Sequence, residues 1–204
     1  MNIQDYLQSR FLSEEQLLTA AECTLLQLQQ WQAERMAPQP SYYVSFSLNC
    51  RSVLAEHQQH RQVRYYAIAT ADWLRLLREY NNAEAAFGHF KAQYKKRLQA
   101  LNVLGVITTD RRFNHGLDAH IQQEWQHFLQ GTYGLCTQTG RIAEIVDKEL
   151  AIAVIEELSA NIDLPDSERL QHAKVLLDKA CAPFPEHEYP GSSRQKYLHP
   201  EFTT

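Results

Sequence analysis

Two glutamates lie on apolar faces of predicted helices, where a carboxyl group is unusual and can do chemistry. Glu149 shares its helix face, at 100° per residue, with five apolar residues: Ile142, Ile145, Val146, Leu150 and Ala153. Glu124 lies inside a similar stripe of Leu117, Ile121, Trp125 and Phe128. Burial raises the pKa of a carboxyl group, and such a group transfers protons near neutral pH. We therefore expect two buried catalytic residues, unless each glutamate is paired with an arginine or with backbone amides and only orders the packing.

A glycine-rich segment, residues 131–140, separates the two predicted helices and holds three of the seven glycines. This density predicts positive φ angles or a close backbone approach, to a neighbouring segment or to a ligand. Hydroxyl groups beside open amides at a helix start suit an anion or a carboxylate. We therefore expect a ligand-binding site made by Thr132, Tyr133, Gly134 and Thr137, with Arg194 from the C-terminal tail.

Cys136 and His127 complete the set of candidate catalytic residues. Cys136 lies a few residues before a predicted helix, whose dipole would lower the pKa of the thiol. The alternative is a buried cysteine that acts as a small hydrophobic residue. His127 borders the apolar stripe that contains Glu124, within reach of the same site.

The spacing Glu124-x-x-His127 also occurs in di-iron carboxylate proteins, so a metal site needs consideration. Such a site requires a second Glu-x-x-His and two further carboxylates, and the sequence contains no second copy. Cys23, Cys50 and Cys181 are far from each other and from Cys136, without zinc-module spacing. We therefore predict no metal site and no disulfide framework, and the sequence indicates no particular cofactor.

The composition is that of an ordinary globular protein with a strong helical bias. The 204 residues carry a formal net charge of −4, which provides no general attraction to nucleic acid or to an anionic membrane. No apolar run is long enough to span a bilayer, and the first residues lack the pattern of a signal peptide. We expect a cytoplasmic protein with no membrane partner.

The N-terminal part predicts two short helices followed by a β-hairpin. A capping box of Ser13 and Gln16 opens a helix that runs to Ala21, and a second helix starts at Thr24. Residues 41–46 and 63–68 favour strands, with a polar stretch between them. Over residues 9–80 this order resembles the winged helix-turn-helix of MerR-type regulators. The resemblance implies DNA binding through residues 13–66, with bases contacted by Thr24, Gln27 and Gln30.

The charge of the same segment does not favour DNA. Residues 1–80 contain seven arginines and no lysine against eight acidic residues, a net charge of −1. Binding to the phosphate backbone calls for a basic surface. The alternative is a helix-turn-helix that serves only as a packing module.

A helix over residues 83–101 carries the most basic patch of the chain. Lys91, Lys95, Lys96 and Arg97 are either a solvated face or a binding surface. The last predicted helix starts at Pro165-Asp166-Ser167 and ends before Pro183. The tail that follows, residues 183–204, is either disordered or docked across the helices.

A second resemblance covers nearly the whole chain. Besides the helix-turn-helix-like start it rests on Trp125-x-x-Phe128-Leu129-x-Gly131-Thr132-Tyr133-Gly134-Leu135-Cys136-Thr137, on Lys148-Glu149 and on Gly191-Ser192-Ser193-Arg194. These segments resemble an uncharacterised bacterial family of natural-product biosynthesis proteins. The resemblance implies a biological setting and no particular reaction.

The sequence therefore predicts a mainly α protein in two parts. Residues 1–82 form a winged helix-turn-helix-like module with a small β-hairpin, and residues 83–204 form a C-terminal helical bundle. For function, we expect a small-molecule-handling protein, enzyme or accessory, in bacterial secondary metabolism. A DNA-binding regulator that senses a metabolite and a structural partner of a biosynthetic enzyme are the alternatives. The oligomeric state is not indicated.

Overall fold

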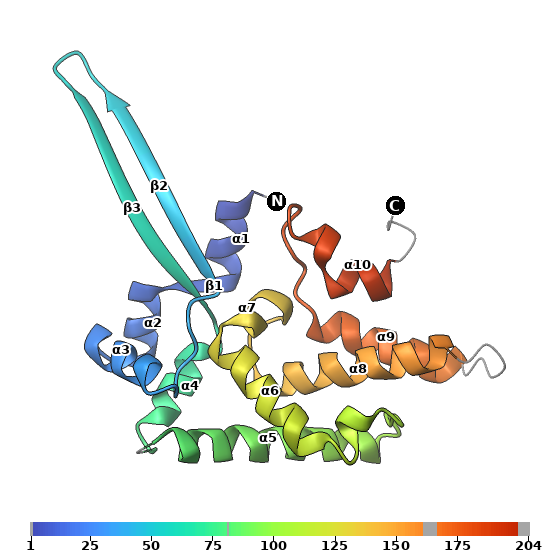
Figure 1. Cartoon of the computed structure of the whole chain (residues 1–204). Coiled ribbons are helices and arrows are strands. Elements are labelled where there is room, and N and C mark those ends of the chain that lie inside the picture. The colour runs from blue at the N-terminus through green and yellow to red at the C-terminus, as the bar shows by residue number, and fades with distance from the viewer. Residues whose placement is uncertain (1, 81, 161–166, 200–204) are drawn as a thin grey trace.

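The computed structural model describes residues 2–80, 82–160 and 167–199 and shows a mainly helical protein with a small antiparallel sheet (Figure 1). The elements, in chain order, are α1 (Ile3–Arg10), β1 (Phe11–Ser13), α2 (Glu14–Ala21), α3 (Leu25–Ala33), β2 (Tyr42–Arg51), β3 (Glu56–Ala67), α4 (Thr70–Leu77), α5 (Ala83–Val103), η1 (Arg111–Phe113), α6 (Leu117–Leu129), α7 (Thr132–Cys136), α8 (Ile142–Ala160), α9 (Ser167–Ala180), η2 (Tyr189–Gly191) and α10 (Ser193–Leu198). The mainly α prediction is confirmed.

The two short N-terminal helices start where the sequence predicts. The Ser13 hydroxyl accepts a hydrogen bond from the Gln16 amide, and the Gln16 side chain accepts one from the Ser13 amide. Thr24 and Gln27 form a second capping box at the start of α3. Each box satisfies amides that the helix itself leaves unpaired. The helices are confirmed as elements, and their role as a DNA-binding module stays a prediction.

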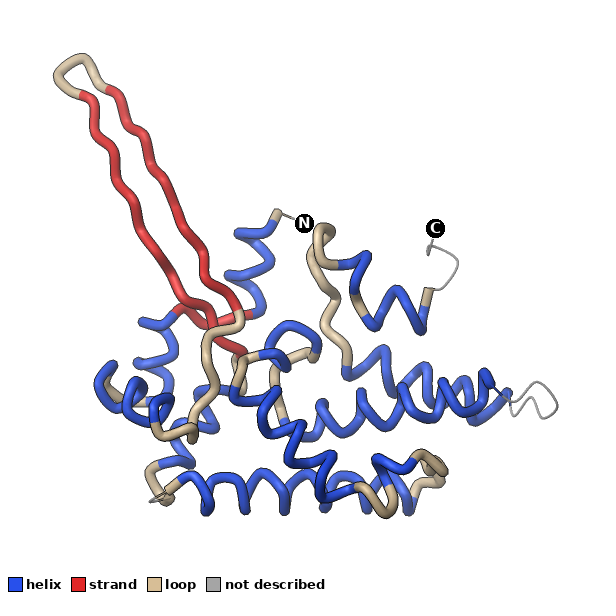
Figure 2. The backbone as a smooth tube through the Cα atoms, viewed as in Figure 1, coloured by secondary structure: helices blue, strands red, loops and turns tan. Residues whose placement is uncertain are grey.

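The hairpin is longer than the sequence predicted. β3 lies between β1 and β2, and its ladder with β2 runs from Tyr42 opposite Tyr65 to Arg51 opposite Glu56. The polar stretch noted between the two predicted strands, residues 56–60, is thus part of β3. A projecting two-stranded ribbon has water on both sides, so polar side chains do not oppose strand pairing there. Figures 1 and 2 show the ribbon extending well away from the helical body.

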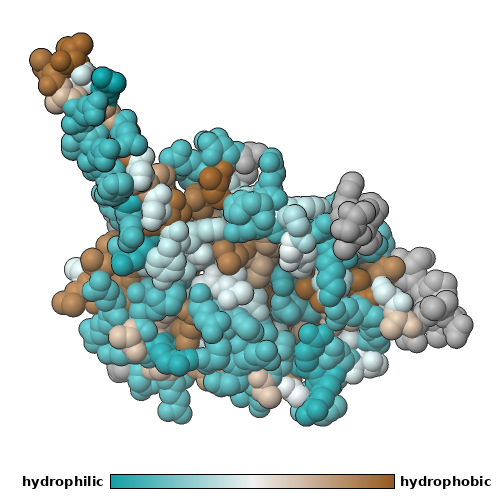
Figure 3. All heavy atoms as spheres, turned by 45° about the horizontal axis from the view of Figure 1, so that its top comes forward, coloured by the Kyte–Doolittle hydropathy of each residue, from teal (hydrophilic) through white to brown (hydrophobic). Residues whose placement is uncertain are grey.

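The outer end of the hairpin carries exposed apolar side chains. Val53 and Leu54 at the turn are almost completely exposed, and Leu48 on β2 is more than half exposed. Figure 3 shows a brown, apolar cap at the outer end of the projecting ribbon. The inner end is covered instead, because Tyr6 and Phe11 pack with Tyr42.

One hydrophobic core connects the N-terminal elements with the helical bundle. It extends from Leu17 in α2 to Cys181 after α9. Trp73 of α4 lies 5.8 Å from the ring of Trp125 and 5.1 Å from that of Phe128, both in α6. Burial of aromatic surface is a large favourable term in folding, so these contacts hold α4 against α6. The division near residue 82 stays a prediction.

The glycine-rich segment contains a short helix, α7, where we expected a continuous loop. Gly131 at its start and Gly140 after its end have φ angles of +77° and +86°. A β-carbon on Gly134 would lie 2.0 Å from the Ser41 hydroxyl oxygen. Positive φ and close approach, both predicted from the glycine content, are therefore confirmed.

The described part of the C-terminal tail is docked across the helices. α10 packs on α9, and Ser192 and Gln195 are buried there. The predicted start of α9 at residues 165–166 and the last residues of the tail, 200–204, lie outside the described residues. Among the described residues, no helix is both long and apolar enough to cross a membrane.

Candidate functional site

A cavity of about 300 Å³ lies between α6, α7 and α8, and we call it the α6–α8 cavity. Its walls combine acidic, basic and hydroxyl-bearing side chains within one small space. They are Arg112, His120, Gln123, Glu124, His127, Thr132, Tyr133, Cys136, Lys148 and Glu149. All four candidate catalytic residues and two of the five predicted ligand-binding residues thus line the same cavity.

Three helices position these side chains. His120, Glu124 and His127 are four and three residues apart on α6, which places them on one face. Gly131, in the left-handed conformation, turns the chain from α6 into α7. α7 can lie close to β3 because Gly134 has no side chain. The opposite wall is α8, which contributes two adjacent charged residues.

Glu124 is the most unusual group in the cavity. The residue is only 4% exposed, and its Oε2 has no hydrogen-bond partner among the described residues. Its Oε1 lies 3.6 Å from His120 Nδ1, longer than a normal hydrogen bond. Burial, reinforced by the nearby charge of Glu149, raises the pKa of Glu124 to about 8. At neutral pH this carboxyl group is therefore mostly protonated.

Glu149 has a different environment from Glu124. Its Oε1 accepts a hydrogen bond of 2.8 Å from Lys148 Nζ, and its side chain is 16% exposed. Burial alone lowers the pKa of Lys148, but attraction to the Glu149 carboxylate outweighs it and the pKa of Lys148 is raised. The expected partial burial of Glu149 is confirmed. The cation that pairs with it, Lys148, comes from the same helix, α8.

The two histidines differ in their contacts. His120 is buried, which lowers its pKa and favours the neutral ring. Its Nε2 lies 3.1 Å from the Tyr94 hydroxyl, which fixes the orientation of the ring. His127 meets Tyr133 edge to face, with 6.4 Å between the ring centroids. Because its lowered pKa makes His120 a weak base, the ring does not take the proton from Glu124.

The Cys136 thiol donates a hydrogen bond of 3.4 Å to the Thr132 carbonyl oxygen. Burial raises the pKa of this thiol to about 12, in the direction opposite to the one an activated nucleophile needs. The structure thus favours the alternative of a small apolar wall residue. A nucleophilic role for Cys136 stays a prediction without support from these contacts.

The start of α8 binds a carboxylate that belongs to the chain itself. Glu144 Oε2 accepts hydrogen bonds from the Thr139 amide at 2.7 Å and the Gly140 amide at 3.1 Å. The Thr137 hydroxyl donates to the Tyr133 carbonyl at 2.6 Å and also accepts from the Gly140 amide. Thr137 and the amides at this helix start, which we expected to bind an anionic ligand, therefore have internal partners.

Two further predicted ligand-binding residues lie outside the α6–α8 cavity. Gly134 faces Ser41 and Ala67. Arg194 forms an ion pair with Asp178 and donates to the carbonyl oxygens of Cys181 and Ala182. In the structure, Arg194 holds the tail to the end of α9.

Four of the cavity residues, Lys148, Arg112, His120 and Gln123, were not among the candidate site residues predicted from the sequence. The signal for Lys148 was its position directly before a carboxylate predicted to be buried, because such a carboxylate needs a cation. Arg112 carried no comparable signal, since it lies in η1, where its guanidinium is held by three hydrogen bonds to Asp110. Only the tertiary fold brings η1 to the cavity.

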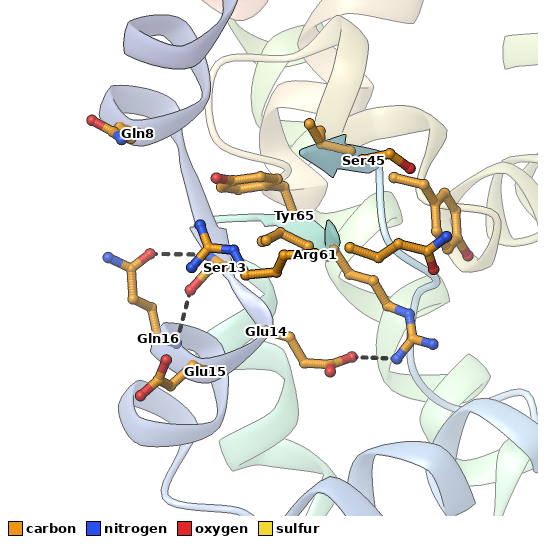
Figure 4. A pocket seen from close by; sticks show the side chains of 13 residues that line it. Gln8, Ser13, Glu14, Glu15, Gln16, Ser45, Arg61 and Tyr65 are labelled. Atoms are coloured by element: carbon orange, nitrogen blue, oxygen red, sulfur yellow. Dashed lines mark hydrogen bonds and ion pairs between the residues drawn. The ribbon is translucent and has the colours of Figure 1, made fainter. Parts of the chain in front are cut away.

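A larger cavity, of about 890 Å³, lies elsewhere, between the base of the hairpin and the first turns of α2 (Figure 4). Glu14 there binds Arg64 at 2.9 Å, and Ser13 and Gln16 form the capping box. These polar groups already have partners in the structure. The α6–α8 cavity contains a buried carboxyl oxygen that has no partner among the residues the structure describes, so it is the stronger candidate for chemistry.

The fold and the site define a mainly helical protein with a carboxyl-lined polar cavity. A family model described as a family of unknown function, DUF6058, matches residues 86–200, more than half of the chain, so the chain belongs to this family. The matched segment contains every residue of the α6–α8 cavity. Comparison with curated proteins and with solved structures finds no match. Among the described residues, no group of three His, Cys, Asp or Glu is placed to hold a metal ion.

Proposed function

We propose that this protein binds a small polar molecule in the α6–α8 cavity and that Glu124 exchanges a proton with it. The observation that carries the proposal is the buried Glu124 Oε2 without a hydrogen-bond partner among the described residues. A buried polar atom without a partner lowers the stability of the fold by about 1–3 kcal/mol. Its presence beside a cavity is therefore more consistent with a role in binding than with a role in packing. A molecule in the cavity would supply the missing partner.

The two carboxyl groups suit different roles. Glu124 has its pKa raised to about 8 by burial, and as a protonated acid it donates a proton or a hydrogen bond at neutral pH. Glu149 is held in an ion pair with Lys148 and accepts hydrogen bonds. Pairs of carboxyl groups in unlike environments are how many enzymes separate acid from base. This division supports acid–base chemistry or proton-linked binding.

The paired charges of the cavity indicate the class of ligand. Lys148 is neutralised by Glu149, and Arg112 by Asp110. With Glu124 protonated, the walls have no uncompensated charge beyond the histidines. A neutral molecule with a carbonyl, amide or hydroxyl group fits this balance, and the volume lies at the lower end of small-molecule sites. We place such a metabolite in bacterial secondary metabolism, the setting that the sequence resemblance suggests.

The test is a melting screen of neutral polar metabolites against the parent protein, Glu124→Gln and Glu84→Gln. Glu84 is an exposed residue of α5 outside the cavity, so Glu84→Gln is the matched control. A ligand at 100 times its Kd stabilises the folded state by about 2.7 kcal/mol. We expect that stabilisation in the parent and in Glu84→Gln, and a smaller stabilisation in Glu124→Gln.

Calorimetry of any ligand found, in two buffers of different ionisation enthalpy, then measures the protons exchanged on binding. We expect proton exchange in the parent and none in Glu124→Gln. Equal binding to both proteins, without proton exchange, would contradict the proposal. A screen that returns no ligand would favour the alternative of a structural partner for a biosynthetic enzyme.

A second candidate is a DNA-binding regulator. What supports it is the arrangement of residues 13–66, in which α3 has an open outer face and the projecting hairpin carries Arg51, Arg61 and Arg64. The side chains of the expected base readers already have local partners, since Thr24 and Gln27 form the cap and Gln30 donates to Glu34. Selection from random duplexes at low salt should return one motif whose affinity falls as salt rises. No enriched motif would remove this candidate.

A further inference from the structure

A separate cavity of about 430 Å³ lies where α4, α5 and the start of α8 meet, and we infer that it binds an apolar molecule bearing one carboxylate. Its lining is Ala69, Asp72, Trp73, Gln93, Lys96, Arg97, Ala100, Phe128, Gly140, Arg141, Ile142 and Ala143. No residue of this α4–α5–α8 cavity belongs to the α6–α8 cavity. The inference is therefore independent of the function proposed for Glu124.

Apolar side chains form the inner part of this cavity. Trp73 and Phe128 are both buried and meet edge to face, with ring centroids 5.1 Å apart. The Trp73 indole N–H already donates to the Met36 carbonyl at 2.8 Å, so the ring offers only its apolar surface. Ile142 and the methyl groups of Ala100 and Ala143 extend this surface. A flat hydrocarbon or aromatic group fits such a wall.

The basic run of α5 is divided between two sides of the helix. Lys91 and Lys95 both bind Asp118, at 3.1 and 2.8 Å. On the other side, Arg97 makes two hydrogen bonds to Asp147, at 2.6 and 2.8 Å. Lys96 lines the cavity and has no acidic partner among the residues described here. The patch is therefore mostly neutralised, except at the cavity.

Arg141 adds a second cation to the cavity. Its side chain is exposed and, within the described ranges, forms no ion pair. The only acidic lining residue, Asp72, is paired with Arg75. Two cations without an acidic partner in the described part of the chain thus lie at a cavity with an aromatic wall. A carboxylate on the ligand would neutralise them while its apolar part covers Trp73 and Phe128.

The experiment is isothermal titration calorimetry with two probes of equal shape, 2-naphthoate and the uncharged 2-naphthamide. We expect 2-naphthoate to bind the parent more tightly than 2-naphthamide. Lys96→Gln and Arg141→Gln should each weaken 2-naphthoate about threefold to fivefold, as expected for exposed ion pairs, and leave 2-naphthamide unchanged. Lys95→Gln, on the neighbouring face of the same helix, is the matched control and should change neither.

A steric variant locates the binding. Ala100 lines the cavity and is exposed on α5, so Ala100→Leu reduces the space without disturbing the core, whereas Ala92→Leu lies on the same helix outside the cavity. We expect Ala100→Leu to weaken both probes at least tenfold and Ala92→Leu to leave them unchanged. The inference is overturned by failure of 2-naphthoate to bind, by equal affinity for the two probes, or by equal effects of Lys95→Gln and Lys96→Gln.

Discussion

At the scale of single residues, the protonation of Glu124 makes a prediction about stability. The folded state holds this proton up to about pH 8, whereas an unfolded glutamate releases it near 4.5. Between these values the parent therefore loses stability as pH rises, by up to about 1.4 kcal/mol per pH unit. Glu124→Gln keeps the neutral form at every pH. We expect it to unfold like the parent near pH 5 and to be more stable near pH 9.

Chemical denaturation of both proteins from pH 5 to 9 measures this difference. The contribution of His120 is common to both and cancels to first order. A difference that stays constant across the range would mean that Glu124 is ionised in the folded protein.

The Lys148–Glu149 pair is a second residue-scale prediction. Removing one partner of a fully buried pair costs about 3–5 kcal/mol, because the other charge stays buried alone. Since Glu149 is 16% exposed, we expect a smaller loss from Glu149→Gln and from Lys148→Met. The double variant should be more stable than the sum of the two losses predicts. Urea unfolding of all four proteins completes the cycle, and additive losses would mean that the two side chains do not interact.

The thiols provide a third prediction. Burial raises the pKa of both Cys136 and Cys181, whereas Cys50 is exposed on the hairpin. We expect iodoacetamide at pH 7 to modify Cys50 first and Cys136 more than tenfold more slowly. Peptide mass spectrometry over time follows each site, and Cys50→Ser should abolish the fast phase. Rapid labelling of Cys136 would restore it as a candidate nucleophile.

At the scale of elements, the placement of α7 depends on Gly134. A β-carbon there would lie 2.0 Å from the Ser41 hydroxyl oxygen and 3.1 Å from the Ala67 methyl group. We expect Gly134→Ala to destabilise the protein by about 1–3 kcal/mol, as overpacking does. Gly88 of α5 is the matched control, because a β-carbon there meets no atom within 4 Å. Gly88→Ala should stabilise the helix by about 0.5–1 kcal/mol. Thermal melts of the two variants and the parent measure these changes in stability. Equal changes in Gly134→Ala and Gly88→Ala would contradict the close approach of α7 to β3.

Helices α2, α3, α5, α6, α8 and α9 could be predicted from the sequence because their signals are local, whereas α1 and α10 were not predicted. The capping boxes at Ser13 and Thr24 lie within four residues, and the apolar stripes around Glu124 and Glu149 repeat with the helical period. The length of the hairpin could not be predicted from the sequence. The pairing of Asn49 with Gln58 depends on the partner strand and not on a local pattern. α7 was missed because its five residues include a glycine.

At the scale of the whole molecule, the candidate site could be predicted only in part. The helical wheel placed both glutamates on inward faces, and both line the α6–α8 cavity. The different environments of the two glutamates could not be predicted, because they depend on which basic side chain the tertiary fold brings next to each carboxyl group. Lys148 approaches Glu149, while Glu124 faces His120 without a normal hydrogen bond. That Arg194 binds Asp178 likewise follows from the path of the tail across α9.

The central claim, that Glu124 is a protonated acid at neutral pH, can be tested by carbon-13 NMR of the glutamate carboxyl groups. In protein labelled at the glutamate side-chain carboxyl carbon, a titration from pH 3 to 10 follows each group, and Glu124→Gln assigns the signal by its loss. The structure predicts one carboxyl group with a midpoint near pH 8 that is missing from Glu124→Gln. If the signal that Glu124→Gln removes titrates below about pH 5, like an exposed glutamate, the claim is contradicted.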